Sequence, residues 1–379
     1  MNAGSLLASL APQRIAVFRA LQLGDMLCSV PALRALREAA PQAHIALIGL
    51  PWAQSFVERY ADLVDELIVF PGAEGFPEQR ESNDGLPAFH EQMRARRFDL
   101  AIQLHGSGGV ANDLLLQFGA SSNAGFVQPQ EQARDGVFID WPDDLPEPER
   151  YLALMSALGA ETRDRQLWFP LSERDGEEYA SLVAAHGIEA QRLVLIHPGA
   201  QLPSRRWPAA RFAEVADRLA AGGWQIAITG TAAEASLTGE VLGAMTAPAL
   251  HLAGATSLGG LAALVAHARL VVCNDTGISH IAAATATASV VIASGSDTQR
   301  WAPLDHALHR VLADYPPCRP CMFRECPYGH PCALNIGVDL VVETALAQLA
   351  GVHGAHPAAP YALHTQAGTG PFEELNHAA

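Results

Sequence analysis

Residues 270–284, LVVCNDTGISHIAAA, run from an apolar, β-branched stretch through a short polar loop into small, helix-forming residues. Leu270–Asn274 is typical of a buried strand, and Gly277–Ala284 is typical of a helix that starts on a glycine. A strand followed by a loop and a helix is the repeating unit of parallel α/β proteins. In such proteins the loops after the strands bind ligands, because the carboxyl ends of the strands share one edge of the sheet.

The same unit recurs on both sides of this stretch. In the second half, further strands are predicted at Leu193–His197, Trp224–Thr229, His251–Leu252 and Ser289–Ala293, with helices at Pro208–Ala221, Ala232–Ala244, Leu258–Ala268 and Val338–Leu349. In the first half, strands are predicted at Ile15–Phe18, His44–Gly49, Glu66–Phe70 and Leu100–Leu104, with helices at Met26–Ala39 and near Tyr151–Leu158. The proline- and acid-rich stretch Gln128–Glu149 is expected to be irregular. We therefore predict an α/β chain with two doubly wound, Rossmann-like halves.

The length of 379 residues fits two domains. With 49% hydrophobic residues, each half has enough apolar side chains for a core of its own. We predict an N-terminal domain over residues 1–170, a C-terminal domain over residues 171–352 and a disordered tail over residues 353–379. Two open sheets in one chain would direct their ligand-binding edges towards a shared cleft.

The charged residues exclude several classes of function. All 24 basic residues are arginines, because the chain contains no lysine, and 40 acidic residues bring the formal net charge to −16. Without an ε-amine the chain cannot be a Schiff-base aldolase, a pyridoxal-phosphate enzyme, a lysine-dependent P-loop NTPase or a protein kinase. The acidic balance argues against a nucleic-acid partner. The sequence has no leader-like or membrane-spanning apolar run, so we expect a cytoplasmic protein.

Asp25 ends the loop RALQLGD, residues 19–25, which joins the first predicted strand to the first helix. The loop lacks the GxGxxG pattern, so dinucleotide binding is not predicted there. The carboxylate of Asp25 would lie at the mouth of the cleft beside a helix start. The structural alternative is an acid that caps or favours that helix start, and taken alone these residues favour the alternative.

Two loops of the second half carry charge after predicted strands. The strand that ends at His197 leads through a Pro-Gly pair to adjacent arginines, Arg205 and Arg206. An arginine fork binds phosphate through two hydrogen bonds, so these side chains predict an anion site, the alternative being two solvated arginines. After the next strand, Glu234 either favours a helix start or accepts hydrogen bonds from a ribose diol.

The loop NDTGISH, residues 274–280, is suited to pyrophosphate. Thr276 and Gly277 would offer a hydroxyl and free N–H groups at a helix start. Asp275 would repel phosphate, and it would instead contact a sugar hydroxyl or cap the helix. His280 follows three residues after Gly277 and would either face the same ligand or belong to the core. Periodicity leaves both interpretations open.

The order and spacing of these loops together resemble the family 9 glycosyltransferases, which are the lipopolysaccharide heptosyltransferases and their relatives. The resemblance covers the chain from Arg14 to about Leu349. The motifs that carry it are Arg19-xxx-Leu23-Gly24-Asp25 followed by Pro31-Ala32-Leu33, His197-Pro198-Gly199-Ala200, Arg206-Trp207-Pro208 and, above all, Asn274–His280. It implies the GT-B fold, in which two Rossmann-like domains face a central cleft, the C-terminal one holding the sugar-nucleotide donor and the N-terminal one the acceptor.

The resemblance also implies roles for individual residues. Asp25 matches the proposed general base of the family, and the residues that match its donor site are Arg205, Glu234, Asp275, Thr276, Gly277 and His280. Arg205 stands where the heptosyltransferases that this chain resembles carry a phosphate-binding lysine, so the charge is kept while reach and geometry change. The reaction implied is an inverting sugar transfer without metal or cofactor. The donor would be ADP-heptose or a similar nucleotide sugar, and the acceptor a lipopolysaccharide core or another surface glycan.

Four cysteines form a cluster spaced C-x2-C-x4-C-x5-C, namely Cys318, Cys321, Cys326 and Cys332. Their number suits a tetrahedral zinc ion, but the second pair lacks the CxxC spacing of a zinc knuckle. Free thiols or a local disulfide are the alternatives, and no metal site is predicted.

Other functions stay open beside the transferase. The chain would also fit a catalytically silent nucleotide-sugar-binding protein, or a GT-B sugar-nucleotide epimerase, which needs a second acid–base pair. A lipid-linked acceptor would bring the protein to the inner membrane as a peripheral protein. The candidates for that contact are Arg34, Arg37, Arg94, Arg96 and Arg97, whose alternative is an ordinary solvated helix face.

Overall fold

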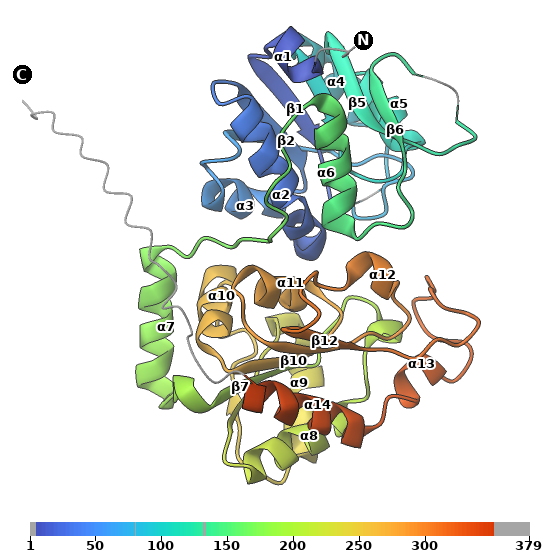
Figure 1. Cartoon of the computed structure of the whole chain (residues 1–379). Coiled ribbons are helices and arrows are strands. Elements are labelled where there is room, and N and C mark those ends of the chain that lie inside the picture. The colour runs from blue at the N-terminus through green and yellow to red at the C-terminus, as the bar shows by residue number, and fades with distance from the viewer. Residues whose placement is uncertain (1–4, 80, 132–133, 352–379) are drawn as a thin grey trace, which may run out of the picture.

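The computed structural model of the chain describes residues 5–79, 81–131 and 134–351. It contains two six-stranded parallel sheets, one in each half of the chain, with helices on their faces (Figure 1). The fold is therefore the α/β class predicted from the sequence. The predicted tail, residues 353–379, lies outside the described residues.

The first sheet has the strand order β3-β2-β1-β4-β5-β6. Its strands are β1 (Arg14–Phe18), β2 (His44–Gly49), β3 (Glu66–Val69), β4 (Leu100–Gln103), β5 (Ser122–Val127) and β6 (Val137–Asp140). The helices of this half are α1 (Leu6–Leu10), α2 (Leu23–Ala39), the 3₁₀ turn η1 (Pro51–Ala53), α3 (Gln54–Arg59), α4 (Leu86–Ala95), α5 (Val110–Leu116) and α6 (Glu147–Leu158). Ile15 of β1 pairs with Ile45 on one side and with Leu100 on the other, which places β1 in the middle.

The second sheet repeats this topology, with the order β9-β8-β7-β10-β11-β12. Its strands are β7 (Leu193–His197), β8 (Gln225–Ile228), β9 (Leu250–His251), β10 (Leu270–Asn274), β11 (Ser289–Ile292) and β12 (His309–Leu312). The helices and 3₁₀ turns are α7 (Glu173–His186), η2 (Ala190–Arg192), η3 (Pro203–Arg205), α8 (Ala209–Ala221), η4 (Ala232–Glu234), α9 (Ala235–Ala244), α10 (Leu258–His267), α11 (Gly277–Ala284), α12 (Thr298–Trp301), α13 (Pro331–Leu334) and α14 (Val338–Gly351). In each sheet the strand order reverses beside the first strand, β1 or β7, where α/β sheets bind ligands.

The central strands lie where the sequence predicts them, whereas one edge strand of the first sheet is not predicted. The bounds of β7, β10 and α11 match the prediction residue for residue. The prediction that Gln128–Glu149 is irregular is wrong, because this stretch contains β6 and the first residues of α6. β6 is an edge strand that pairs only with β5, and its side chains are half-buried or exposed. Its apolar run, Val137, Phe138 and Ile139, is only three residues long, which is shorter than the runs by which strands are identified.

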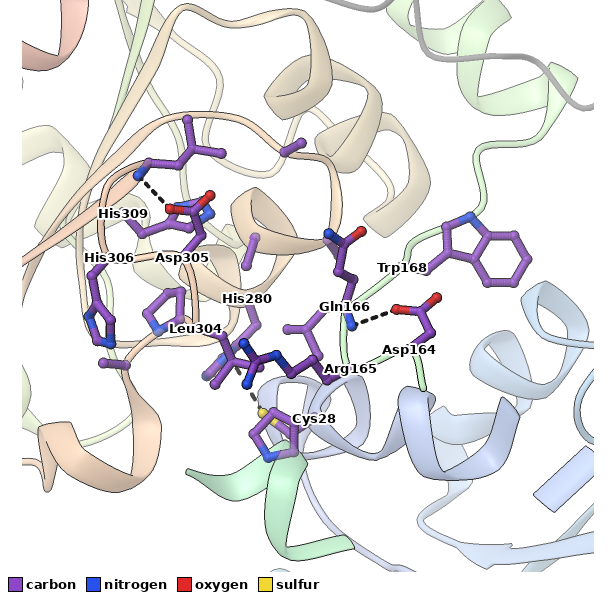
Figure 2. A pocket seen from close by; sticks show the side chains of 18 of the residues that line it. Cys28, Asp164, Arg165, Gln166, Trp168, His280, Leu304, Asp305, His306 and His309 are labelled. Atoms are coloured by element: carbon purple, nitrogen blue, oxygen red, sulfur yellow. Dashed lines mark hydrogen bonds between the residues drawn. The ribbon is translucent and has the colours of Figure 1, made fainter. Parts of the chain in front are cut away.

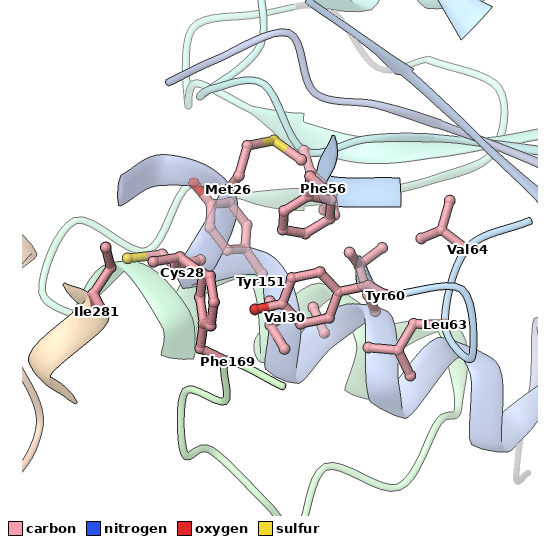
Figure 3. Close-up of a cluster of buried hydrophobic side chains, with 14 of the residues drawn as sticks. Met26, Cys28, Val30, Phe56, Tyr60, Leu63, Val64, Tyr151, Phe169 and Ile281 are labelled. Carbon is pink, nitrogen blue, oxygen red and sulfur yellow. The ribbon is translucent and has the colours of Figure 1, made fainter. Parts of the chain in front are cut away.

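One continuous hydrophobic cluster runs through both halves of the chain. The connecting segment, residues 159–172, joins α6 of the first half to α7 of the second. Figure 3 shows Cys28 and Val30 of α2 beside Tyr151 of α6, Phe169 of the connecting segment and Ile281 of α11. All five side chains are buried. The two halves thus share apolar surface along α2 and α11, and burying that surface favours the closed arrangement seen here.

A second contact between the halves lies where the chain passes from one to the other. Arg59 of α3 binds Asp175 of α7 through two hydrogen bonds, Nη1 to Oδ2 at 2.6 Å and Nη2 to Oδ1 at 3.2 Å. Tyr60 donates its hydroxyl to the carbonyl of Trp168 at 2.5 Å. These polar bonds fix the connecting segment against α3.

Candidate active site

The starts of α2 and α11 meet at the contact between the two halves. Gly24 lies against His280, since a Cβ atom on Gly24 would stand 2.8 Å from His280 Cδ2. A Cβ atom on Gly277 would stand 3.5 Å from Leu23 Cδ2. These helices follow β1 and β10, the strands beside the two reversal points. The structure therefore brings together the Asp25 loop and the loop at residues 274–280, as the sequence predicts.

Asp25 occupies the first turn of α2, close to several charged groups. Its backbone carbonyl accepts a hydrogen bond from Arg19 Nε at 3.0 Å and another from Arg19 Nη2. Burial raises the pKa of the Asp25 carboxyl above its ordinary value, although the positive charge of Arg19 opposes that shift. The negative charge of Glu147 adds to it. A carboxylate with a raised pKa is the kind of group that enzymes use as a general base.

Arg19 fixes the start of α2 from inside the core. Its side chain is fully buried, and Nη1 donates to the carbonyl of Leu104 at the end of β4. Its guanidinium lies over the ring of Tyr151, 4.4 Å from the centroid, in a cation–π contact. One arginine thus connects β4, α6 and the backbone of Asp25.

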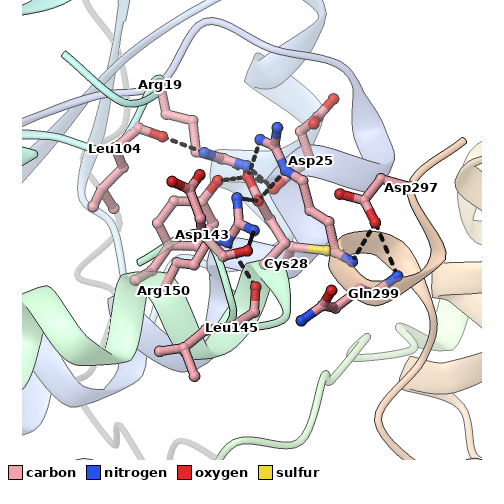
Figure 4. A network of polar contacts seen from close by, with 12 residues as sticks. Arg19, Asp25, Cys28, Leu104, Asp143, Leu145, Arg150, Asp297 and Gln299 are labelled. Atoms are coloured by element: carbon pink, nitrogen blue, oxygen red, sulfur yellow. Dashed lines mark hydrogen bonds and ion pairs between the residues drawn. The ribbon is translucent and has the colours of Figure 1, made fainter. Parts of the chain in front are cut away.

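Glu147 and Arg300 join the two halves beside this arginine. Glu147, the first residue of α6, is fully buried and accepts a hydrogen bond from the hydroxyl of Tyr151. Arg300 of α12 donates from Nε to Glu147 Oε2 at 2.5 Å and from Nη2 to Oε1 at 2.9 Å. Burial would raise the pKa of Glu147, but the hydrogen bonds and charge of Arg300 outweigh it and lower the pKa. Figure 4 shows Arg19, Asp25 and neighbouring residues of α12 gathered in this polar network.

In the loop at residues 274–280, one side chain is bonded to neighbouring loops and another has no capping hydrogen bond. The buried side chain of Asn274 accepts from the backbone N–H of Trp207 at 3.0 Å and donates to the carbonyl of Pro198 at 2.7 Å. Thr276 is the N-cap residue of α11, yet its side chain makes no capping hydrogen bond. Its hydroxyl and the first N–H groups of α11 are thus the groups here that suit an anion.

His280 contacts α2 rather than open space. Its ring is buried, and Nδ1 lies 3.7 Å from Cys28 Sγ. Burial lowers the pKa of His280, although Asp275 and Asp25 oppose that shift. These contacts agree with the interpretation of a histidine in the core, at the junction of the halves. Its role in binding a donor stays a prediction.

Glu234 uses one carboxylate oxygen to cap a helix. Glu234 Oε2 accepts from the backbone N–H of Thr231 at 2.8 Å and from its hydroxyl at 2.9 Å. The other oxygen, Oε1, lies against the strand end, where a Cβ atom on Gly199 would stand 2.0 Å from it. Only a glycine leaves room for that approach. The helix-start interpretation therefore accounts for Oε2, and binding of a nucleoside stays a prediction for Oε1.

Arg205 binds backbone carbonyls on two other loops. Nη1 donates to the carbonyl of Ser294 at 3.4 Å, and Nη2 donates to that of Cys321. Arg206 donates from Nε to the carbonyl of Ala200 at 2.9 Å. Arg205 therefore lies at the carboxyl edge of the second sheet, between the loop after β11 and the cysteine-rich loop.

The cysteine-rich loop packs against the same edge. The backbone N–H of Cys321 donates to the carbonyl of Gly295 at 2.9 Å, and His330 Nε2 lies 2.8 Å from the carbonyl oxygen of Ser204. All six cysteines are free thiols. In the part of the chain that the structure describes, no group of three or more His, Cys, Asp or Glu side chains is placed to hold a metal ion.

Comparison with known proteins decides the family. A family model described as glycosyltransferase family 9 (heptosyltransferase) matches residues 86–331. The chain belongs to glycosyltransferase family 9. Lipopolysaccharide heptosyltransferase 2 of Salmonella typhimurium is 28% identical over 316 residues, which cover 77% of this chain and 86% of that protein. The enzyme of the same name from Escherichia coli K12 is 28% identical over 315 residues, with the same coverage.

Solved structures agree with this assignment. A family 9 glycosyltransferase from Veillonella parvula superimposes with a TM-score of 0.76 at 23% identity, covering 89% of this chain and 98% of that one. The E. coli ADP-heptose lipopolysaccharide heptosyltransferase II superimposes with a TM-score of 0.66 at 24% identity, covering 89% and 99%. At such identities the likeness establishes the fold, which is the predicted GT-B fold. The chain is thus a glycosyltransferase with the two facing sheets of that fold.

Several titratable residues near Asp25 of this glycosyltransferase are not among those that its sequence singles out. Glu147 and Arg300 are two of them, and Glu78 and His105 are two more. Glu78 Oε2 is buried without a hydrogen-bond partner and lies 3.9 Å from His105 Nε2. Burial raises the pKa of Glu78, and the charge of Asp25 adds to that rise. The first half therefore places two carboxyl groups, those of Glu78 and Glu147, near Asp25 together with the positive charge of Arg19.

A cavity of about 630 Å³ opens between the halves of the glycosyltransferase. Figure 2 shows Cys28 and His280 next to each other in its lining, with Gln166 and Trp168 on one side and His306 on the other. None of the predicted base and donor residues other than His280 lines it. The cavity therefore borders α2 and α11 at Cys28 and His280 and is not the predicted donor site.

The arginines considered for membrane contact are largely engaged within the glycosyltransferase. Three of them form ion pairs, namely Arg34–Asp164, Arg37–Asp65 and Arg96–Glu66. Arg94 donates from Nε to the carbonyl of Gln117 at 3.2 Å. Among the described residues, no helix has both the length and the apolar character needed to cross a bilayer.

Proposed function

We propose that this glycosyltransferase moves a heptose from ADP-heptose to a hydroxyl of a lipopolysaccharide-core saccharide, with inversion at the anomeric carbon and without a metal. The names of its relatives support this choice of donor and acceptor. The observation that carries the proposal is the meeting of the starts of α2 and α11. It sets the half-buried Asp25 beside the loop that carries Asp275, Thr276 and Gly277.

In the proposed reaction Asp25 is the general base. It takes the proton from an acceptor hydroxyl while the hydroxyl oxygen attacks the anomeric carbon of the donor. The bond from that carbon to the phosphate oxygen breaks in the same step, and the nucleoside diphosphate leaves with its electron pair. Attack from the side opposite to the leaving group inverts the anomeric configuration.

The departing diphosphate gains negative charge, which the second half of the chain is suited to stabilise. The hydroxyl of Thr276 and the first N–H groups of α11 are available for it. Arg205 would supply a full positive charge from the next loop, in the position where the resembling enzymes carry lysine. These groups would perform the task that a bound cation performs in metal-dependent transferases.

Binding of nucleotide sugars tests the donor assignment. A ligand that binds only the folded state raises the unfolding temperature, by about 3 °C for a chain of this length at roughly 100 times its Kd. In a panel of ADP-, GDP- and UDP-sugars, we expect ADP-heptose to raise the unfolding temperature most. Differential scanning fluorimetry measures this shift.

Two arginine variants sharpen that experiment. Arg205→Gln should reduce the shift with every donor, because the diphosphate is common to all of them. Arg192→Gln removes an exposed arginine of the same half that pairs with Glu189 at 3.2 Å, and it should leave the shift unchanged. If no nucleotide sugar stabilises the unmodified chain, the proposed donor class is wrong.

A further inference from the structure

The contact between Arg300 and Glu147 does more than hold the two halves together. We propose that Arg300 is a positioning residue, through which closure of the second half onto the first sets the place and the charge environment of Asp25. The inference rests on the proposed function only in taking Asp25 as the base. Arg300 itself touches neither donor nor acceptor in this account.

A chain of direct contacts leads from Arg300 to Asp25. Arg300 holds both oxygens of Glu147, and Glu147 in turn accepts from the hydroxyl of Tyr151. The ring of Tyr151 lies under the guanidinium of Arg19, which holds the backbone carbonyl of Asp25. Glu147, Tyr151 and Arg19 are fully buried, so none of them can relax into water when a neighbour is removed. A shift at α12 is therefore transmitted to the first turn of α2.

The short helix α12 is built to present Arg300 to the first half. The Asp297 side chain caps it by accepting from the backbone N–H groups of Gln299 at 3.0 Å and Arg300 at 3.3 Å. Gln299 Nε2 reaches across to the carbonyl of Asp144 at 3.1 Å. The guanidinium of Arg300 also lies 5.5 Å from the ring centroid of Trp141. Arg300 thus has a fixed direction, held by Trp301 of its own helix at 4.4 Å and by Glu147 and Trp141 of the other half.

Separation of the halves would change the charge next to Asp25. Glu147 raises the pKa of Asp25, whereas Arg300 lowers it. Withdrawing Arg300 would remove the hydrogen-bonded counter-charge of Glu147, leave Arg150 Nη1 at 3.8 Å from its carboxylate, and make Asp25 harder to ionise. Closure of the two halves would therefore favour the ionised, working form of Asp25 relative to the open state, which limits wasteful attack by water in the open state.

Other charged groups near Asp25 belong to both halves. Arg19 and His280 lower its pKa, as Arg300 does. The charge of Asp25 also acts on Glu78 and on Cys28, which lie close by. Of these groups, Arg300 and Glu147 form the pair that joins the two halves through direct hydrogen bonds.

Opposite effects of two neutral variants test the proposal. Transfer requires ionised Asp25, so kcat falls as the pH falls through the pKa of Asp25. Arg300→Gln removes a charge that lowers this pKa, so the acidic limb of the kcat profile should move to higher pH by about one unit. Glu147→Gln removes a charge that raises it, so the limb should move to lower pH by about the same amount. The Kd of the donor, measured by calorimetry, should stay within about twofold in both.

A conservative variant separates charge from geometry. Arg300→Lys keeps the positive charge but loses the planar fork that holds both oxygens of Glu147. We expect its acidic limb to return close to that of the unmodified chain, while kcat at the optimum stays about tenfold lower because Asp25 is less well placed.

A matched ion pair provides the control. Arg59 and Asp175 also join the two halves through two hydrogen bonds, but they lie beside the connecting segment rather than beside Asp25. Arg59→Gln should lower the unfolding temperature and leave the acidic limb unchanged. If Arg300→Gln and Glu147→Gln shift the limb in the same direction, or not at all, the proposal is wrong. The same conclusion follows if Arg59→Gln reproduces their shifts.

The variants distinguish an error in the proposed base from an error in the role of Arg300. Should Arg300→Gln fail to fold, Glu147→Gln still tests the proposal, because the arginine that loses its hydrogen-bonded carboxylate, Arg300, is partly exposed to water. If Asp25→Asn keeps its turnover, the proposed base is wrong. If Asp25→Asn is inactive and the two limb shifts are absent, only the role of Arg300 is wrong.

Discussion

Asp25→Asn should lower the transfer rate by about a thousandfold or more while leaving donor binding intact. The substitution keeps the shape of the side chain and removes its ability to accept a proton, and general-base catalysis contributes roughly 10²–10⁴-fold. The donor is proposed to bind the second half, so its Kd should not change. Release of nucleoside diphosphate in the presence of acceptor measures the first quantity, and calorimetry with donor alone measures the second.

Stability separates this effect from damage to the fold. Burial raises the pKa of Asp25, which means that the folded state disfavours its charged form. Replacing it by a neutral amide of the same size should therefore leave the unfolding temperature unchanged or slightly higher. A variant that keeps most of its turnover would show that another group accepts the proton.

Gly24→Ala should have the second-largest effect, because it separates the two helix starts. The new Cβ atom would stand 2.8 Å from His280 Cδ2, closer than such atoms approach in proteins. His280 is buried between the halves, so its ring cannot turn away at little cost. We expect kcat to fall about a hundredfold, since a base displaced by even part of an ångström is poorly aligned with the reacting atoms.

A second glycine in a helix gives the matched control. Gly239 of α9 has no atom within 4 Å of the position that a Cβ atom would take. Gly239→Ala should be neutral for kcat and should stabilise the fold by about 0.4–1 kcal/mol, because alanine is less flexible in the unfolded chain. Equal kcat values for Gly24→Ala and the unmodified chain would show that the junction of α2 and α11 does not align the base.

Much of the fold could be predicted from the local sequence pattern, and the strand that could not be predicted depends on contacts outside its own residues. Strands that are buried on both faces, such as β7 and β10, are continuous apolar runs bounded by polar loops, so their bounds could be predicted. The edge strand β6 is half-buried, lies within a stretch rich in proline and acids, and depends on its pairing with β5. Its three apolar residues, Val137, Phe138 and Ile139, are too short a run to be identified as a strand among the surrounding loop residues.

The same distinction holds for the site. Asp25 and the loop at residues 274–280 could be predicted because each follows a central strand, and strand ends of facing sheets converge. Glu147 and Arg300 could not, since their partnership joins residues 153 positions apart. In the sequence Glu147 is an ordinary acid in the first turn of a helix, and only the closed arrangement shows that it is buried and paired across the halves.

At Arg205 the structure shows what an arginine does in the position where the resembling enzymes carry lysine. A planar guanidinium can donate to two carbonyls at once, and Arg205 does so to Ser294 and Cys321 on separate loops. An ammonium group would reach this edge of the sheet as a single point of charge. Arginine in this position therefore also organises the loops around the proposed diphosphate site.

The anomeric configuration of the product tests the central claim most directly. The purified chain would be incubated with ADP-heptose, a truncated lipopolysaccharide-core acceptor and EDTA, and the product analysed by NMR. The account predicts one added heptose whose anomeric configuration is opposite to that in the donor, with nucleotide release that requires the acceptor. A retained configuration, or transfer that EDTA abolishes, would contradict a single metal-free displacement assisted by Asp25.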